Sequence, residues 1–333
     1  MRKAQRRDFL FAAGALLATP LACLAQPAQK VRRIGFLSPD ASSSVFGQRA
    51  REMFAASLRG LGYEEGKNLV IEWRWGEAKV ETLPALAEEL VRLKVELIVA
   101  RTNDPITAAK RATRTIPIVM LNSNHPVEMG LIPSLAHPGG NITGTSYATP
   151  ELIEKQIQLV KEIAPSAVRV AIVWAEGSGD TGVAIMVDSL DRVADRAGMK
   201  LQYFDVSARG EVKAVLDRIA ASHIDALWVS GSPLARAHQD EIAAFALKQK
   251  LVSVGAIPTY AEIGGLLTYS PDTKESFDRT ASYVDRILKG AKPADLPAEQ
   301  PTRFNLVINL KTAEALGIKI PQSLLVRADR VIE

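Results

Sequence analysis

The chain has 333 residues, of which 47% are hydrophobic and 23% charged, and its formal net charge is +4 at pH 7. This composition excludes a disordered chain and a membrane-embedded one, and the length suits two domains of ordinary size. Residues 1–25 hold four basic residues and one acidic residue, so the remaining chain has 37 basic and 36 acidic side chains. That balance argues against a surface for nucleic acid or for membranes.

The N-terminus has the pattern of an export signal. A basic stretch precedes the short apolar run 11–17, and small residues follow up to Ala25. The run is too short to span a bilayer, and residues 6–10, Arg-Arg-Asp-Phe-Leu, resemble a twin-arginine signal. We therefore expect cleavage near Ala25 and a periplasmic product. The alternative is lipid attachment at Cys23, the one cysteine, but Pro20 stands where lipoprotein signals usually have an aliphatic residue.

From Val31 onward, short apolar runs alternate with longer amphipathic segments, which is typical of β-α-β units around parallel sheets. We predict strands at 33–37, 69–73, 97–100, 118–121, 168–174, 201–204, 226–229 and 251–254. Helices are predicted at 46–61, 83–93, 151–163, 183–197 and 235–248. The two halves, divided near residue 145, repeat one order of elements. The sequence therefore predicts an α/β fold with two Rossmann-like, doubly wound lobes.

Small hydroxyl and amide residues follow most of the predicted strands. In open α/β sheets, ligands bind beyond the carboxyl ends of the strands, so two facing lobes would enclose a cleft. Helix N-termini there could hold a carboxylate without a fixed cationic side chain. Pro105 is expected at a first helical position, capped by Thr102, Asn103 or Asp104. For any single loop, ordinary helix capping is the alternative explanation.

The candidate ligand-binding residues come from these loops and from aromatic side chains near strand ends. Aromatic rings can stack on a flat ligand, although Tyr147, Trp174, Trp228 and Tyr260 could equally belong to the core. The predicted binding residues are Ser38, Asn103, Asn124, Pro126, Tyr147, Trp174, Ser178, Ser230 and Tyr260.

Several longer stretches resemble one known family. They are residues 33–38, 61–75, 126–131, 135–144 with Pro-Gly-Gly-Asn-Ile-Thr-Gly, 264–269, 287–301, 307–317 and 324–329. Together they resemble the ABC-transporter substrate-binding family that includes tryptophan- and tyrosine-binding lipoproteins, over almost the whole mature chain. The resemblance implies a type I periplasmic-binding fold with three chain crossings, near Thr145, Ser270 and Phe304. Lobe 1 would comprise 31–145 and 271–303, and lobe 2 with the hinge would comprise 146–270 and 304–333.

The same resemblance implies a function. The protein would be a monomeric, periplasmic solute-binding component that delivers a small ligand to an ABC transporter permease, with no catalysis and no cofactor. An aromatic amino acid or a small aromatic carboxylate is the expected ligand. Two departures from the family pattern should face the cleft: His125 replaces an Asp before Pro126-Val127, and residues 101–104, Arg-Thr-Asn-Asp, replace a glycine-rich turn. The ligand can therefore differ from those amino acids.

One alternative is an exported NAD(P)-dependent oxidoreductase. Gly177, Gly179 and Gly182 form a G-x-G-x-x-G sequence between a predicted strand and helix, and Asp205 stands 23 residues further on, as in dinucleotide-binding sites. Glu176 argues against this function because it would place negative charge beside a diphosphate. The four histidines lack metal-ligand spacing and no nucleophile elbow is present, so we expect no metal and no catalytic residue.

Overall fold

The computed structural model describes residues 30–147, 150–174, 181–206 and 212–333. The chain divides into two compact units, Met1–Val31 and Arg32–Glu333, and the second is described below. The expected export signal lies outside the described residues. Among the described helices, none has the length and the apolar character needed to cross a membrane.

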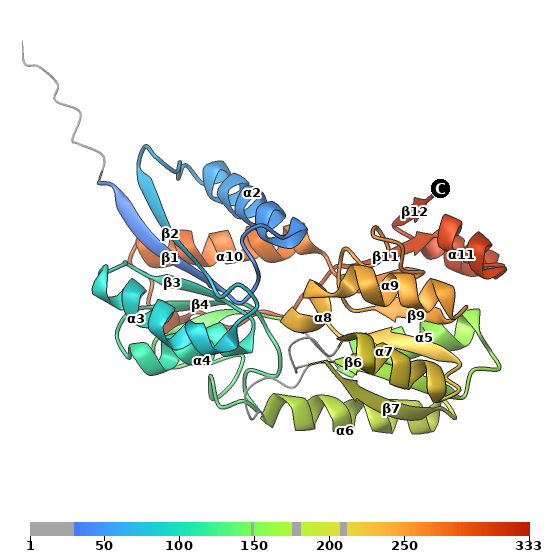
Figure 1. Ribbon diagram of the computed structural model, residues 1–333. Helices are drawn as coiled ribbons and strands as arrows, with labels where there is room; N and C mark the ends of the chain where they lie inside the picture. The colour runs from blue at the N-terminus through green and yellow to red at the C-terminus, as the bar shows by residue number, and fades with distance from the viewer. Residues whose placement is uncertain (1–29, 148–149, 175–180, 207–211) are drawn as a thin grey trace, which may run out of the picture. The chain divides into compact units, whose positions relative to one another are not determined.

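The first sheet is parallel throughout and has the strand order β2-β1-β3-β4-β5. Four helices pack on it, α2 and α10 on one face and α3 and α4 on the other (Figure 1). We call this sheet with its helices the five-stranded layer. Its strands are Arg32–Ser38, Leu69–Trp75, Ile98–Arg101, Ile118–Ser123 and Ile142–Ser146 for β1 to β5; its helices are Val45–Gly60 (α2), Leu83–Arg92 (α3), Asn103–Ala112 (α4) and Thr273–Leu288 (α10).

The packing of strand β4 explains why the strands of this sheet are continuous apolar runs in the sequence. Val119 and Leu121 contribute to the cluster under α2 and α10, whereas Ile118 and Met120 contribute to the cluster under α3 and α4. All four side chains are fully buried. A sheet covered by helices on both faces has no solvent-facing side, so the apolar–polar alternation of a half-exposed strand is absent.

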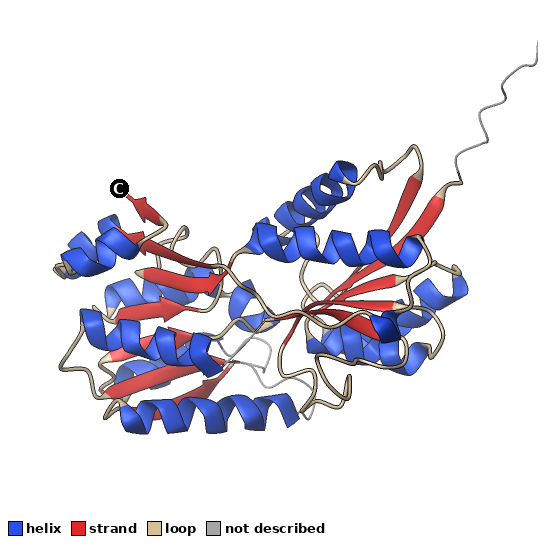
Figure 2. Cartoon of the chain, turned by 180° about the vertical axis from the view of Figure 1, so that it is seen from behind, coloured by secondary structure: helices blue, strands red, loops and turns tan. Residues whose placement is uncertain are grey.

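The second sheet has the order β12-β11-β10-β9-β8-β6-β7 and is parallel except between β10 and β11. Figure 2 shows helices on both of its faces, and we call the whole the seven-stranded layer. Its strands are Arg169–Trp174 (β6), Lys200–Asp205 (β7), Ala226–Val229 (β8), Val252–Gly255 (β9), Leu267–Pro271 (β10), Phe304–Asn309 (β11) and Arg330–Ile332 (β12); its helices are Pro150–Ile163 (α5), Thr181–Arg196 (α6), Val212–Ala221 (α7), Pro233–Ala237 (α8), Gln239–Lys248 (α9), Leu310–Leu316 (α11) and Gln322–Arg327 (α12).

The chain passes between the two layers three times: after β5, after β10 and before β11. Helix α10 packs against α2, and the Ser57 hydroxyl donates to Asp278 Oδ1 at 2.7 Å. The predicted α/β fold of two doubly wound sheets is confirmed. The lobe boundaries predicted from the sequence stay a prediction.

Two local predictions were wrong. The expected single helix at 235–248 is divided into α8 and α9 at His238, whose φ of −110° and ψ of 16° are not helical. Pro105 is the third residue of α4 and not the first, because the helix begins at Asn103 after Thr102. The list of predicted strands also omitted β5, β10, β11 and β12.

Candidate functional site

A buried cluster of charged side chains joins the two layers. Asp40 follows β1, Arg101 ends β3, and Arg236 lies on α8 of the seven-stranded layer. Arg101 Nη1 donates to Asp40 Oδ2 at 2.5 Å, and Arg236 Nε lies 2.9 Å from Asp40 Oδ1 without hydrogen-bond alignment. All three residues are at most 7% exposed. We call Asp40, Arg101 and Arg236 the arginine centre.

Local sequence features set the positions of these side chains. Ser44 caps α2 by accepting from the Gly47 N–H at 3.0 Å, and a Cβ at Gly47 would lie 2.4 Å from the Ala41 carbonyl oxygen. The loop that carries Asp40 can therefore fold tightly onto the start of α2. Ser232 caps α8 in the same way by accepting from the Ala235 N–H, which fixes the helical turn that carries Arg236.

An aromatic ring lies against both guanidinium groups. Phe46, the second residue of α2, has its ring centroid 4.1 Å from Arg101 Cζ and 5.1 Å from Arg236 Cζ. The attraction between a cation and the face of an aromatic ring strengthens when both are removed from water. Phe46 therefore stabilises two like charges in one buried place while leaving the N–H edges of both groups available.

The arginine centre has a net positive charge, because it contains two guanidinium groups and one carboxylate. Burial raises the pKa of the Asp40 carboxyl, but Arg101, Arg236 and the Ser38 hydroxyl more than offset this, so the pKa lies below its ordinary value. Burial lowers the pKa of Arg101 to about 10, partly offset by Asp40, so Arg101 remains charged at neutral pH. Two guanidinium groups thus share one carboxylate.

Tyr147 adjoins the centre and also links the layers. Its hydroxyl donates to the Ala256 carbonyl at 2.8 Å, and Ala256 directly follows β9. Burial raises the pKa of Tyr147 to about 12, although the nearby Arg236 and Arg101 act to lower it. The phenol therefore stays protonated at neutral pH.

A second set of polar groups lies at the ends of β3 and β4. The Asn103 amide nitrogen donates to the Asn124 carbonyl at 2.9 Å. Its amide oxygen accepts from the Ser123 hydroxyl at 3.0 Å and from the Asn124 N–H at 2.9 Å. Asn103 therefore uses its side chain to hold the turn after β4, and ligand contact by Asn103 stays a prediction.

Several buried polar atoms at these strand ends have no hydrogen-bond partner within the described part of the chain. They are Arg101 Nε, Asn122 Oδ1, Asn124 Oδ1, Ser146 Oγ and Trp174 Nε1. Unsatisfied buried polar groups are costly and rare in folded proteins. They come from β3, β4 and β5 of one layer and from β6 of the other, which makes this region a candidate ligand-binding site.

The backbone at the same strand ends is strained. Thr102 has φ 63°, Asn122 has φ 62° and His125 has φ 49°. Non-glycine residues rarely adopt positive φ, and such strain concentrates at ligand-binding and active sites. The strain independently supports a site at the ends of β3 and β4.

Three of the predicted binding residues lie beside the arginine centre or at corresponding strand ends. Ser38 is fully buried, and its hydroxyl donates to Asp40 Oδ2 at 2.8 Å. Tyr147 has the position given above. Ser230 is buried after β8 and donates to the Ser232 hydroxyl at 3.0 Å. Ligand contact by these residues stays a prediction.

The other aromatic and turn residues differ in their surroundings. Trp174 is partly buried at the end of β6, with its ring edge-on to Tyr203 at 6.2 Å. Trp228 is a core residue whose Nε1 donates to Gln156 at 3.0 Å. Pro126 is buried, and its carbonyl accepts from the Leu131 N–H at 2.9 Å within a turn.

Tyr260 has a core position in the structure. Its ring is fully buried in the core between α9 and the seven-stranded sheet. A Cβ at Gly255 or at Gly265 would lie 2.5 Å or 2.2 Å from ring atoms of Tyr260. The ring has the core position that the sequence left open as an alternative, because these two glycines allow the backbone to enclose it. Ligand contact by Tyr260 stays a prediction.

Some of the residues singled out in the sequence are not among those that the structure describes. Ser178 lies there, as do Gly177 and Gly179 of the glycine motif, whereas Gly182 belongs to α6. Within the described ranges, no group of three His, Cys, Asp or Glu residues is arranged to hold a metal ion.

Sequence reasoning missed the arginine centre. It expected a carboxylate to be held without a fixed cation, whereas Arg101 and Arg236 are both buried here. Arg101 carried a signal, since it stands where the resembled family has a glycine-rich turn. Nothing in the sequence around Arg236 indicated that it is buried, because an arginine within a predicted amphipathic helix usually faces solvent.

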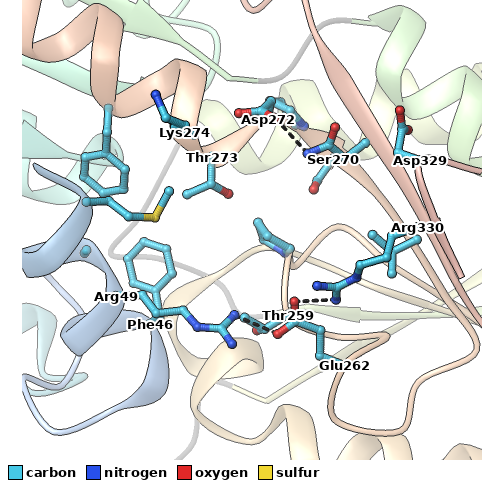
Figure 3. Close-up of a pocket in the computed structure, with 17 residues that line it drawn as sticks. Phe46, Arg49, Thr259, Glu262, Ser270, Asp272, Thr273, Lys274, Asp329 and Arg330 are labelled. Carbon is cyan, nitrogen blue, oxygen red and sulfur yellow. Dashed lines mark hydrogen bonds and ion pairs between the residues drawn. The ribbon is translucent and has the colours of Figure 1, made fainter. Parts of the chain in front are cut away.

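A cavity of about 410 Å³ lies beside Phe46, between α2, the β10–α10 junction and strands β11 and β12. Figure 3 shows Arg49 and Arg330 both directed at Glu262, with Asp272 and Lys274 on the opposite wall. Arg49 Nη1 is 2.7 Å and Arg330 Nη2 2.5 Å from Glu262. Because Arg49 belongs to the five-stranded layer, this ion pair also joins the two layers.

Comparisons with known proteins agree on one family. The model of the family described as ABC transporter substrate binding protein matches residues 47–332. A tyrosine-binding protein of Clostridioides difficile (strain R20291) is 27% identical over 272 residues, covering 81% of this chain and 77% of its own. A conserved domain protein of Vibrio cholerae has a TM-score of 0.84 and 27% identity, covering 91% of this chain and 100% of its own. An ABC domain of Streptococcus pneumonia in complex with L-Trp has a TM-score of 0.82 and 25% identity, covering 90% and 99%.

Proposed function

The chain belongs to the ABC transporter substrate-binding protein family, and we propose that it is the periplasmic receptor of an ABC importer. It captures a small ligand at the strand ends where the two layers meet and delivers it to the permease. The observation that supports this site is a set of buried polar atoms from both layers that have no hydrogen-bond partner within the described ranges. The tyrosine-binding relative and the complex with L-Trp support an aromatic amino acid or small aromatic carboxylate as the ligand.

Ligand binding at these strand ends would favour the state in which the two layers are close together. Asn122 and Ser146 come from the five-stranded layer and Trp174 from the seven-stranded layer. A ligand that contacts both sets gains its full binding energy only when the layers are together, so it favours that state. A permease can recognise such a state, which is the property an importer needs from its receptor.

Native mass spectrometry of the protein purified after export tests the ligand. We expect a small organic molecule to co-purify, and its addition to refolded protein should restore the same mass. In the same preparation, N-terminal sequencing should give a start near Gln26, whereas a lipid-modified Cys23 would favour membrane anchoring. Calorimetric titration with NAD(H) and NADP(H) examines the oxidoreductase alternative.

The outcomes separate the two functions. Nucleotide binding that is lost on Gly179→Val would favour the oxidoreductase. If neither the co-purified fraction nor a panel of amino acids and aromatic acids binds to the folded protein, the receptor function is wrong.

A further inference from the structure

We propose that Arg101 and Arg236 bind the carboxylate of the ligand, and that Asp40 holds the two guanidinium groups in position for it. The inference rests on the proposed receptor function and adds the side chains that bind the carboxylate group of the ligand. It starts from the arginine centre, in which both cations are nearly inaccessible to water.

The first argument is the charge of the centre. Both arginines have their ion pair with Asp40 in the described part of the chain, so two positive charges face one negative charge. Removing an ion from water costs several kcal/mol unless an opposite charge and hydrogen bonds compensate. One additional negative charge would make the buried centre neutral, and a ligand carboxylate supplies it.

The second argument is the unused hydrogen-bonding capacity. Each guanidinium group has five N–H donors. Arg101 donates through Nη1 to Asp40, while its buried Nε has no hydrogen-bond partner among the residues that the structure describes. Arg236 donates through Nη2 to the Gly231 carbonyl at 2.6 Å, and its Nε is poorly aligned with Asp40. Such donors suit a planar carboxylate, which guanidinium groups bind through paired hydrogen bonds.

The third argument is the position of the centre within the candidate site. The charges of Arg236 and Arg101 both act to lower the pKa of Tyr147, because its phenol lies near the two guanidinium groups. Its neighbour Ser146 has a buried hydroxyl, and Asn124, whose N–H is bound by Asn103, has a buried amide oxygen; neither oxygen has a hydrogen-bond partner in the described segments of the chain. The cations and the unsatisfied polar atoms therefore belong to one region, where the carboxylate and the remainder of one ligand can be bound together.

The competing explanation is a purely structural ion pair, in which Asp40 links the layers and the arginines contact no ligand. Both explanations predict destabilisation when an arginine is removed. Only ligand binding predicts that the arginines distinguish an acid from its amide, because the amide has the same shape without the charge.

The experiment is calorimetric titration with pairs of probes: L-tryptophan and L-tryptophanamide, L-tyrosine and L-tyrosinamide, and indole-3-acetate and indole-3-acetamide. If an acid is found to co-purify with the protein, that acid and its amide are titrated as a further pair. We expect the acid to bind about ten- to a hundredfold more tightly than its amide, the loss typical of one charged hydrogen-bonding partner. Arg236→Gln should abolish this preference, and Arg236→Lys should retain part of it.

Arg218→Gln is the matched control, since Arg218 also lies over an aromatic ring, 5.7 Å from the centroid of Phe204, but on exposed α7. It should leave the acid preference unchanged. Circular dichroism verifies folding of each variant, and Arg101→Gln, which also removes one positive charge, replaces Arg236→Gln if the latter does not fold.

Four results would overturn the inference. Equal binding of acid and amide by the unaltered protein, or an acid preference that survives Arg236→Gln, would refute the carboxylate site while leaving the receptor function intact. A co-purified ligand without an anionic group would do the same. If no compound binds at all, the receptor function fails and the inference fails with it.

Discussion

At the residue scale, Asn103 shows how a side chain at the predicted position can have a different role. Its amide makes three hydrogen bonds to Ser123 and Asn124, two residues that follow each other at the end of β4. The turn that presents Asn124 to the candidate site therefore depends on a residue of the neighbouring strand end. Asn103 positions the site without needing to contact the ligand itself.

Asn103→Ala should consequently destabilise the ligand-free protein. We expect a loss of about 1–3 kcal/mol in the free energy of unfolding, because buried partners of the amide are left unsatisfied. Asn103→Asp keeps the accepting oxygen but places an oxygen where Nδ2 donates to the Asn124 carbonyl, so it should also be less stable than the unaltered protein. Urea denaturation of the mature protein measures both values.

Ser146→Ala is the contrasting control, since the Ser146 hydroxyl is buried without a partner in the described part of the chain. Its removal should leave the unfolding free energy nearly unchanged or slightly higher and weaken ligand binding. An Asn103→Ala protein as stable as the unaltered one would contradict the positioning role.

At the element scale, β5 illustrates the close packing that the site requires. Gly144 lies in β5 with φ 132°, and a Cβ there would stand 2.3 Å from the Met120 carbonyl oxygen of β4. The strand can therefore approach β4 and carry Ser146 and Tyr147 to the passage between the layers. Glycine is needed at this position for both its backbone conformation and its lack of a side chain.

We expect Gly144→Ala to lower the free energy of unfolding by about 1–3 kcal/mol or more, as overpacking does in well-packed cores. Ligand affinity should fall as well, because Ser146 and Tyr147 would shift. Thermal and urea unfolding, followed by titration of the identified ligand, measure the two effects.

Gly60→Ala is the control, because Gly60 ends α2 and a Cβ added there would meet no atom within 4 Å. Alanine there should be neutral or stabilise by about 0.5–1 kcal/mol. Equal behaviour of the two variants would show that β4 and β5 can separate more easily than their geometry indicates.

At the scale of the whole molecule, contacts of unequal strength join the two layers. The buried pair of Asp40 and Arg236 is shielded from water, whereas Arg49, paired with Glu262, has a side chain that is 50% exposed. Exposed ion pairs contribute about 0.2–1 kcal/mol and are weakened by salt. We therefore expect the exposed pair of Arg49 and Glu262 to contribute less to the attraction between the layers than the shielded pair of Asp40 and Arg236.

From this we expect Arg49→Ala to reduce ligand affinity less than about fivefold, the equivalent of 1 kcal/mol. The reduction should shrink further at high salt. Small-angle scattering should show that the ligand still makes the variant more compact. Lys213→Ala, which removes a pair with Asp217 inside one helix, serves as the control, and a loss of tenfold or more for Arg49→Ala would contradict the ranking.

The sequence by itself determined the fold class and most of the elements. Apolar runs and amphipathic segments are local patterns, so they placed β1 to β4 and β6 to β9 to within a few residues. The short strand β12 and the polar start of β11, Phe304 and Asn305, lack such a pattern. These strands exist because β11 pairs with β10, a partner that is distant in the chain, and β12 pairs with β11.

The tertiary structure alone decided which side chains meet. Strand ends were correctly identified as the place of the polar loops, but the direction of each side chain depends on its neighbours in space. Asn103 turned toward Ser123, Tyr260 was enclosed by Gly255 and Gly265, and Arg236 was buried against Asp40. Asp40 and Arg236 are far apart in the sequence and belong to different layers. Their charges compensate each other only after folding, and for that physical reason no local pattern could reveal the arginine centre.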